Sequence, residues 1–263
     1  MSAGQGLFND GAAYERLMGR WSRRAGNIFL DWIDVPKNLR WIDIGCGTGA
    51  FTDEVIKRCA PDAVLAIDPS AEQLAFARNR PGLETAEFRV GDAQDLQVED
   101  DSFDIAVMAL VVHFVPEPSK AIAEMARVLR PGGLGATYVW DYLIGGSPNA
   151  PLAAAIKSLG IESAPPPSAK ATSLQALQEL WRSAGFQEIE TRVIRIPVTF
   201  DDFDEFWGSI SAPVGPAGKA IAAMSPDTLQ RLRAAVREQV PIAADGRVSY
   251  EACANAIKGK VKG

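Results

Sequence analysis

The chain has 263 residues, of which 47% are hydrophobic and 23% are charged, and its formal net charge is −6. This length and composition predict a soluble globular protein of one α/β domain with insertions, or of a domain and a half, with ample material for a buried core. The negative charge argues against a long surface that follows a nucleic acid backbone, although a local basic patch stays possible.

The cysteines and the apolar runs exclude further classes of protein. Cys46, Cys59 and Cys253 are odd in number and scattered, so they suit neither a disulfide framework nor a metal site. The longest apolar run, 105–112, is too short to cross a membrane. The first residues lack the basic and apolar regions of a signal peptide. We therefore expect a cytoplasmic protein with no metal and no membrane partner.

The N-terminal part predicts a helical cap at about 10–35. Residues 1–12 are polar and glycine-rich, whereas 14–24 are aromatic and basic and predict an irregular helix. This helix continues over 25–33, where apolar residues recur at helical spacing, and Pro36 ends it.

A short apolar strand at about 40–45 leads into a glycine-rich turn and then a helix. Gly45, Gly47 and Gly49 alternate there, and glycine permits both a positive φ and close approach of a ligand to the backbone. The free N–H groups at the start of the next helix favour an anionic or polar ligand group. The spacing is neither the dinucleotide fingerprint nor a Walker loop. The turn therefore predicts a nucleotide-type site at the end of the first strand.

Two further strands end beside acidic residues. The buried strand 63–68 ends in Asp68, and a helix follows to about Arg80, with Ser70 as its N-cap. In a βαβ unit, Asp68 lies beside the glycine turn and can accept both ribose hydroxyls. A third strand at 85–90 precedes Asp92, which can accept the exocyclic amine of adenine. Both aspartates have a plainer interpretation as capping or turn residues.

The next elements complete a parallel sheet. Residues 103–109 are apolar throughout, as in a central parallel strand. Residues 110–115 continue the chain from this strand into the next loop and contain His113, the only histidine in the chain. A helix over 119–130, a turn at 131–133 and a fifth strand at 134–140 follow. The alternation of strands and helices predicts right-handed crossovers.

The C-terminal part alternates regular elements with insertions. Residues 142–172 predict a lid-like insertion, and a helix over 173–184 and a strand over 187–200 follow it. A second, helical insertion occupies about 201–244, with helices at 201–210 and 227–239 and a break at 212–216 between them. A last strand is expected at 247–256.

Ordered motifs between residues 40 and 140 resemble the class I S-adenosylmethionine (SAM)-dependent methyltransferases. They are Asp43-Ile44-Gly45-Cys46-Gly47-Thr48-Gly49, Ala66-Ile67-Asp68, Gly91-Asp92-Ala93, Phe103-Asp104, and Glu124 with Arg127-Val128-Leu129-Arg130-Pro131-Gly132-Gly133. Within that family they are similar to the small-molecule branch that includes ubiquinone- and menaquinone-biosynthesis methyltransferases. The resemblance implies a Rossmann-like class I methyltransferase fold over a single domain, 1–263. Its sheet has seven mostly parallel strands with helices on both faces and an antiparallel last strand.

The resemblance also implies SAM as cofactor and S-adenosylhomocysteine as product. In it the glycines approach the methionine part and the ribose, and Asp43 fixes the turn and the ammonium. From position and composition, Arg20 is the candidate cation for the carboxylate of SAM. Cys46, between two glycines, is a small packing residue and not a nucleophile. The expected cofactor residues are Tyr14, Arg20, Trp21, Asp43, Gly45, Cys46, Gly47, Gly49, Asp68, Pro69, Ser70, Gln73, Asp92, Ala93, Met108, Ala109 and Leu110.

Methyl transfer is an in-line displacement that needs alignment and exclusion of water. A base is needed only where the acceptor must lose a proton. His113 is the candidate catalytic base, with a structural role as the alternative. The expected acceptor pocket comprises Trp140, Asp141, Tyr142, Phe203 and Trp207, and helix packing explains the last two equally well.

The sequence thus predicts an enzyme that methylates an oxygen, carbon or nitrogen of a small apolar or aromatic acceptor, acting as a monomer or homodimer. A SAM-binding protein without catalysis is an alternative. A nucleic acid methyltransferase is disfavoured by the acidic balance and by Met108-Ala109-Leu110-Val111, which stands where an Asn/Asp-Pro-Pro-Tyr/Phe motif would be. A dehydrogenase is disfavoured by the glycine spacing.

Overall fold

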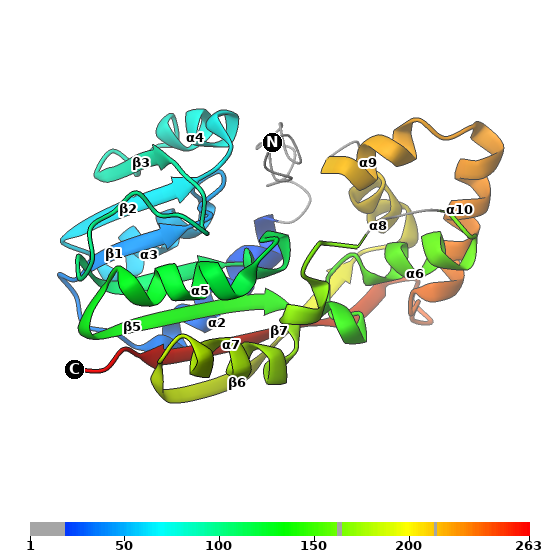
Figure 1. Ribbon diagram of the computed structural model, residues 1–263. Coiled ribbons are helices and arrows are strands. Elements are labelled where there is room, and N and C mark those ends of the chain that lie inside the picture. Colours follow the sequence, from blue (N-terminus) through cyan, green and yellow to red (C-terminus); the bar gives the residue numbers. More distant parts are fainter. Residues whose placement is uncertain (1–18, 162–164, 213–214) are drawn as a thin grey trace.

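The computed structural model describes residues 19–161, 165–212 and 215–263. Within them, seven strands form one sheet in the order β3-β2-β1-β4-β5-β7-β6 (Figure 1). Neighbouring strands among β1 to β5 are parallel, whereas β7 runs antiparallel to both β5 and β6. The expected mostly parallel sheet with an antiparallel last strand is confirmed. The strands are β1 Arg40–Ile44, β2 Ala63–Asp68, β3 Ala86–Val90, β4 Phe103–Ala109, β5 Leu129–Trp140, β6 Gln187–Phe200 and β7 Val248–Lys260.

Helices cover both faces of the sheet because successive strand side chains point to opposite sides. Trp41 packs in the cluster that includes α2 and α3, whereas its neighbour Ile42 packs in the cluster of α5 and α7. Figure 1 shows α5 and α7 in front of the sheet and α2 and α3 behind it. The helices are α2 Arg20–Ile33, α3 Ala50–Cys59, α4 Ala71–Arg78, α5 Pro118–Arg127, α6 Ala150–Ser158, α7 Leu174–Ser183, α8 Phe203–Ile210, α9 Gly215–Ala222 and α10 Pro226–Gln239.

The helix α2 is held on the sheet by aromatic side chains. Phe29 is fully buried, and its ring centroid lies 4.8 Å from that of Tyr138 on β5 and 6.0 Å from that of Phe51 on α3. Rings of this size contribute about 0.5–1.5 kcal/mol per pair beyond their buried area. The N-terminal cap is thus part of the main core where it is described, which is from residue 19 onward.

The two insertions pack together at one end of the sheet, where Figure 1 shows α6, α8, α9 and α10. Leu152 on α6 and Leu232 on α10 lie in the same core cluster as Phe206 on α8. This cluster is continuous with the sheet through the ends of β6 and β7. Neither α6 nor α9 was expected: α6 lies within the supposed lid and α9 begins inside the supposed break at 212–216.

Two strands are longer than expected. The fifth strand begins at Leu129 and not at Leu134, because the segment 131–133 bulges within β5: Phe103 pairs with Leu129, and Ile105 pairs next with Leu134. The last strand extends to Lys260 and not to Ala256, since Ile257 and Lys258 continue the pairing with β5.

Among the described residues, no helix has the length and apolar character needed to cross a bilayer.

Candidate functional site

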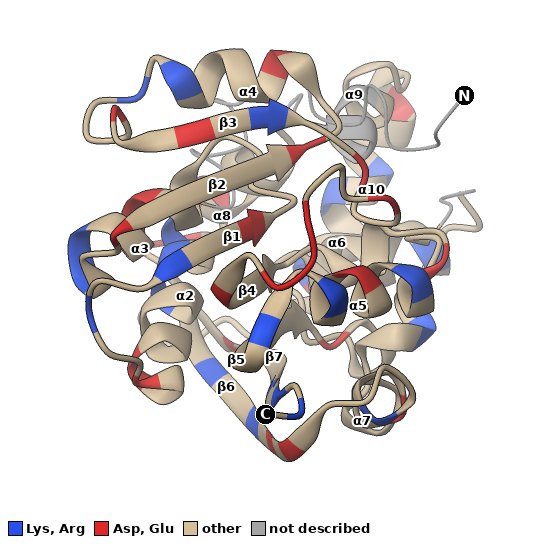
Figure 2. Ribbon diagram, turned by 60° about the vertical axis from the view of Figure 1, so that its left-hand side comes forward, with Lys and Arg blue, Asp and Glu red and all other residues tan. Residues whose placement is uncertain are grey.

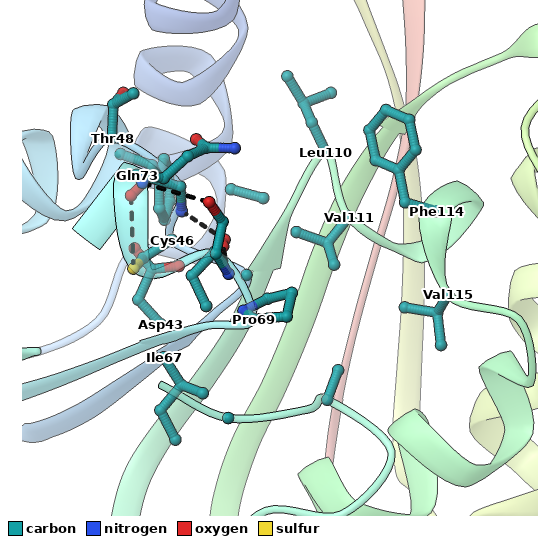
Figure 3. A pocket seen from close by; sticks show the side chains of 18 of the residues that line it. Asp43, Cys46, Thr48, Ile67, Pro69, Gln73, Leu110, Val111, Phe114 and Val115 are labelled. Atoms are coloured by element: carbon teal, nitrogen blue, oxygen red, sulfur yellow. Dashed lines mark hydrogen bonds between the residues drawn. The ribbon is translucent and has the colours of Figure 1, made fainter. Parts of the chain in front are cut away.

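One cavity opens at the carboxyl end of the parallel strands, the edge where α/β sheets bind ligands. Acidic residues stand at the ends of β1 and β2 (Figure 2). Figure 3 shows Leu110, Val111, Phe114 and Val115 across the cavity from Thr48 and Gln73. The lining residues are Ser22, Asp43, Gly45, Cys46, Gly47, Thr48, Ala50, Phe51, Ile67, Asp68, Pro69, Ser70, Gln73, Gly91, Asp92, Ala93, Gln94, Ala109, Leu110, Val111, Phe114, Val115, Pro116 and Tyr138.

The glycine turn is built for backbone approach. Gly45, Gly47 and Gly49 all have positive φ, at 81°, 53° and 75°. A Cβ on Gly45 would lie 2.5 Å from a methyl carbon of Val111, so a side chain there is blocked as well as strained. Gly45 and Gly47 line the cavity, so main chain without side chains borders it there.

Asp43 carries a buried carboxyl group, and one of its two oxygens accepts no hydrogen bond from the described residues. Its side chain accepts a 2.6 Å hydrogen bond from Thr52 Oγ1 at Oδ2, whereas Oδ1 is buried with no partner among the described residues. Burial raises the pKa of Asp43 from 3.8 to about 7, against the opposing effect of the Thr52 bond. A cationic or N–H-bearing ligand would satisfy this oxygen and stabilise its charge.

Asp68 closes the glycine turn onto β2. Its Oδ2 accepts from Gly47 N and its Oδ1 from Ser70 N, each at 2.8 Å. Burial raises the pKa of Asp68, and these two bonds oppose that rise. A carboxylate oxygen has further lone pairs, so both oxygens can still accept from a ligand. Ser70 caps α4 through a 3.2 Å bond from Gln73 N, which confirms the expected N-cap.

Asp92, after β3, is held by Gln94. The backbone N–H and the side-chain amide of Gln94 both donate to Asp92 Oδ1, at 2.9 and 3.1 Å. The Gln94 amide oxygen in turn accepts from Glu117 N at 2.9 Å, which ties this turn to the start of α5. Gln94 lines the cavity beside Asp92 and Ala93.

The wall opposite the turn is apolar and comes from the segment after β4. It consists of Leu110, Val111, Phe114, Val115 and Pro116. Leu110 has a φ of 62°, a left-handed conformation that is uncommon for a side chain of this size. Such conformations concentrate at functional sites, where the surrounding fold enforces them. The Leu110 N–H donates to Tyr138 O at 2.9 Å and so fixes the bend.

His113 lies behind this wall in a short 3-10 helix, η2 Val112–Phe114, and does not line the cavity. It is 1% exposed, and burial lowers its pKa from 6.5 to about 3. Its Nε2 is 3.5 Å from Tyr142 Oη, and its Nδ1 has no partner among the described residues. The imidazole is therefore neutral at physiological pH.

A network of hydrogen bonds holds Tyr142 beside His113. Asn255 on β7 donates to Asp141 Oδ2 at 2.8 Å and to Thr172 O at 2.9 Å. Thr172 Oγ1 accepts from Tyr142 N at 3.2 Å. This network joins the last strand to the two ends of the first insertion, which are the short helices η3 Tyr142–Ile144 and η4 Ala169–Thr172.

The expected site residues divide in two. Most of the expected cofactor residues line the cavity together. They include Cys46, and burial raises the pKa of its thiol, so the thiol stays neutral. Gly49 shapes the turn from behind, and Met108 is fully buried. Tyr14 lies outside the described residues. Those described but outside the lining are Arg20, Trp21, Gly49, Met108, His113, Trp140, Asp141, Tyr142, Phe203 and Trp207.

Several lining residues were not expected. The apolar Val111, Phe114, Val115 and Pro116 follow strand four directly, so their position after Leu110 was the available signal. Gln94 follows Asp92 in the same turn. Ser22, Phe51 and Tyr138 come from α2, α3 and β5, and only the packing of those elements brings them to the cavity.

Comparison with known proteins places these features in a family. Residues 42–137 match the family described as Methyltransferase domain. The chain is 37% identical over 117 residues to 2-methyl-6-phytyl-1,4-hydroquinone methyltransferase 2, chloroplastic, of Oryza sativa subsp. japonica. That match covers 44% of this chain and only 34% of the rice protein.

Two solved structures share the fold. YcgJ of Bacillus subtilis has a TM-score of 0.62 at 19% identity, covering 91% of this chain and 98% of that one. Phosphoethanolamine N-methyltransferase 2 of Haemonchus contortus, in complex with S-adenosyl-L-methionine, has a TM-score of 0.59 at 17% identity, covering 96% of this chain and 56% of that one. The resemblance and the fold inferred from the sequence motifs are confirmed: this chain carries a methyltransferase domain at residues 42–137 within a class I methyltransferase fold.

Proposed function

We propose that this protein is a SAM-dependent methyltransferase that acts on a small apolar or aromatic acceptor. One observation carries the proposal: a single cavity at the carboxyl edge of the sheet combines a bare glycine turn, three aspartates and an apolar wall. The rice relative, named for a phytyl hydroquinone, and the SAM complex of the nematode enzyme support it.

The polar half of the cavity fits SAM. The unused, buried Oδ1 of Asp43 suits the ammonium of the methionine part, because a positive partner offsets the burial of that carboxylate. Asp68 has lone pairs left for the ribose hydroxyls, and Asp92, with Ala93 and Gln94, suits the edge of adenine. These assignments account for the order of the three aspartates along β1, β2 and β3.

The chain's own residues would position the reactants and keep water out. SAM supplies a methyl group already activated by its sulfonium. The glycine turn and Asp43 hold one side of the cavity, and Leu110, Val111 and Phe114 hold the other. An apolar wall excludes water from the line of attack and favours an apolar or aromatic acceptor. The bent backbone at Leu110 fixes the wall relative to the turn.

Proton removal from the acceptor is a separate question. His113 is buried behind Phe114 with its ring centroid 3.9 Å from that ring, and it is held neutral. As a base it would need a route to the cavity through the wall or through Tyr142. The catalytic role of His113 and the acceptor-pocket roles of Trp140, Asp141, Tyr142, Phe203 and Trp207 stay predictions.

The test is methyl transfer itself. The protein is incubated with methyl-labelled SAM and a panel of alkylated hydroquinones, phenols and amines, and the label is followed into product. We expect transfer to an apolar aromatic acceptor, and loss of transfer in Asp68→Asn. An exposed aspartate outside the cavity, Asp62→Asn, is the matched control.

The outcomes separate the candidate functions. Binding of SAM without transfer to any acceptor, cell extract included, would favour a SAM-binding protein without catalysis. Label in nucleic acid would support the nucleic acid methyltransferase. We further propose one domain over the whole chain, a cytoplasmic location and a monomeric or homodimeric state, the last measurable by light scattering.

A further inference from the structure

The helix α2 brings a polar residue to the cavity from outside the segment that matches the family, residues 42–137. Ser22 lines the cavity, and its hydroxyl oxygen is buried with no hydrogen-bond partner among the described residues. Buried polar atoms without partners are rare in native proteins, and each needs an explanation. A ligand in the cavity provides one, because a serine hydroxyl can rotate to meet it.

A series of neighbouring residues connects Ser22 with Asp43 along one wall of the cavity. The Tyr138 hydroxyl donates to Ser22 O at 3.4 Å, and the Tyr138 ring packs on Phe51 with centroids 5.8 Å apart. The residue after Phe51, Thr52, donates to Asp43. Asp43 thus offers an acceptor and Ser22 a donor on the α2 and α3 side. Asp68 and Asp92 follow β2 and β3, on the other side of β1 from β4 and β5.

The charge of the cavity makes a neutral donor important. Its described lining contains three aspartates and no lysine, arginine or histidine. Arg20, the nearest candidate cation in the sequence, lies over the rings of Trp21 and Phe200, at 4.3 and 4.4 Å from their centroids, outside the lining. Among the described lining residues, the groups that could donate to a carboxylate are hydroxyl, side-chain amide and backbone N–H groups.

We propose that Ser22 donates its hydroxyl to the carboxylate of the amino acid part of SAM, while Asp43 accepts from the ammonium. Ser22 is then a specificity-determining residue: it distinguishes the full cofactor from adenosine compounds that lack the amino acid. The inference rests on the proposed function. It makes α2 a direct part of the cofactor site.

The test compares two ligands that differ in this part. S-adenosylhomocysteine keeps the amino acid, and 5′-methylthioadenosine lacks it. We expect Ser22→Ala to raise the Kd of S-adenosylhomocysteine at least about tenfold, because a hydrogen bond to a charged group is lost. The Kd of 5′-methylthioadenosine should change less than about twofold. Titration calorimetry measures both.

Asn27→Ala is the matched control. Asn27 lies on the same helix, and its Oδ1 is also buried with no partner among the described residues, but it does not line the cavity. We expect it to leave the ratio of the two Kd values unchanged. Thermal unfolding of both variants verifies that α2 stays folded.

Three results would count against these ideas in different ways. An unchanged Kd for S-adenosylhomocysteine in Ser22→Ala overturns the role of Ser22. Equal weakening of both ligands also overturns it, since Ser22 would then act on the adenosine part or through the helix. Failure of the unaltered protein to bind either ligand overturns the proposed function instead.

Discussion

Replacing Asp43 by Asn should separate stability from binding. The side chain is buried at 1% exposure, and its pKa rises from 3.8 to about 7 on folding. The folded protein therefore holds a proton that the unfolded chain releases between about pH 4 and pH 7. Because the folded state binds more protons in this window, the free energy of unfolding falls as the pH rises. The interval between 3.8 and about 7 corresponds to about 4 kcal/mol.

The asparagine amide is neutral at every pH, so the variant avoids this fall in the free energy of unfolding at high pH. Its oxygen can still accept from Thr52 Oγ1, now at 2.6 Å from Oδ2. We expect Asp43→Asn to raise the free energy of unfolding at pH 8 by about 2–4 kcal/mol, the lower figure allowing for an unpaired amide N–H. At pH 5 the gain should shrink by more than half, since the native carboxyl is then protonated. Binding of S-adenosylhomocysteine should weaken at least about tenfold, because the ammonium loses a charged acceptor.

Urea denaturation at pH 5 and pH 8 measures the stability of both proteins, and calorimetry measures binding. Asp62→Asn, a change at an exposed carboxylate, is the control for the loss of one negative charge. An Asn variant that is less stable than the unaltered protein by the same amount at both pH values would refute the reasoning. It would mean that Asp43 is ionised in the folded state with a satisfied partner.

Three more changes probe the site. Gly45→Ala places a Cβ 2.5 Å from Val111 at a φ of 81°, so it should lower the free energy of unfolding by about 1–3 kcal/mol and weaken S-adenosylhomocysteine binding; unchanged binding would contradict the close-approach role. His113→Gln should leave the shape of the turnover–pH profile between pH 6 and 9 unchanged because its pKa is about 3, whereas loss of a limb of that profile in the variant would contradict this. Asn255→Leu leaves Asp141 Oδ2 and Thr172 O without their donor and should lower the free energy of unfolding by about 2–4 kcal/mol, and an unchanged Tm would contradict this.

The sequence predicted the strands β2 and β4 closely because each is a largely apolar, buried segment. The strands at Ala63–Asp68 and Phe103–Ala109 have the expected bounds. The first of these strands ends in Asp68, a polar residue that lines the cavity, so this polar part of the site was also predictable from the sequence.

The insertions were harder to predict because their helices are specified by contacts with each other. The helix α6 follows a glycine- and proline-rich stretch, and its Leu152 finds its partners on α10, far along the chain. The same reason applies to Ser22 and Tyr138 at the cavity. No local pattern marks them, since the packing of α2 against β5 places them there.

The placement of β7 between β5 and β6 has a consequence for biosynthesis. A ribosome makes β5 and β6 before β7, and residues 201–247 emerge between β6 and its partner strand. Until β7 is made, β5 presents an open edge and β6 has no neighbour in the sheet. The parallel half can close early, while the antiparallel half must wait. Stalled translation before Val248 should therefore yield a nascent chain with exposed strand edges, a target for chaperones and a source of aggregation.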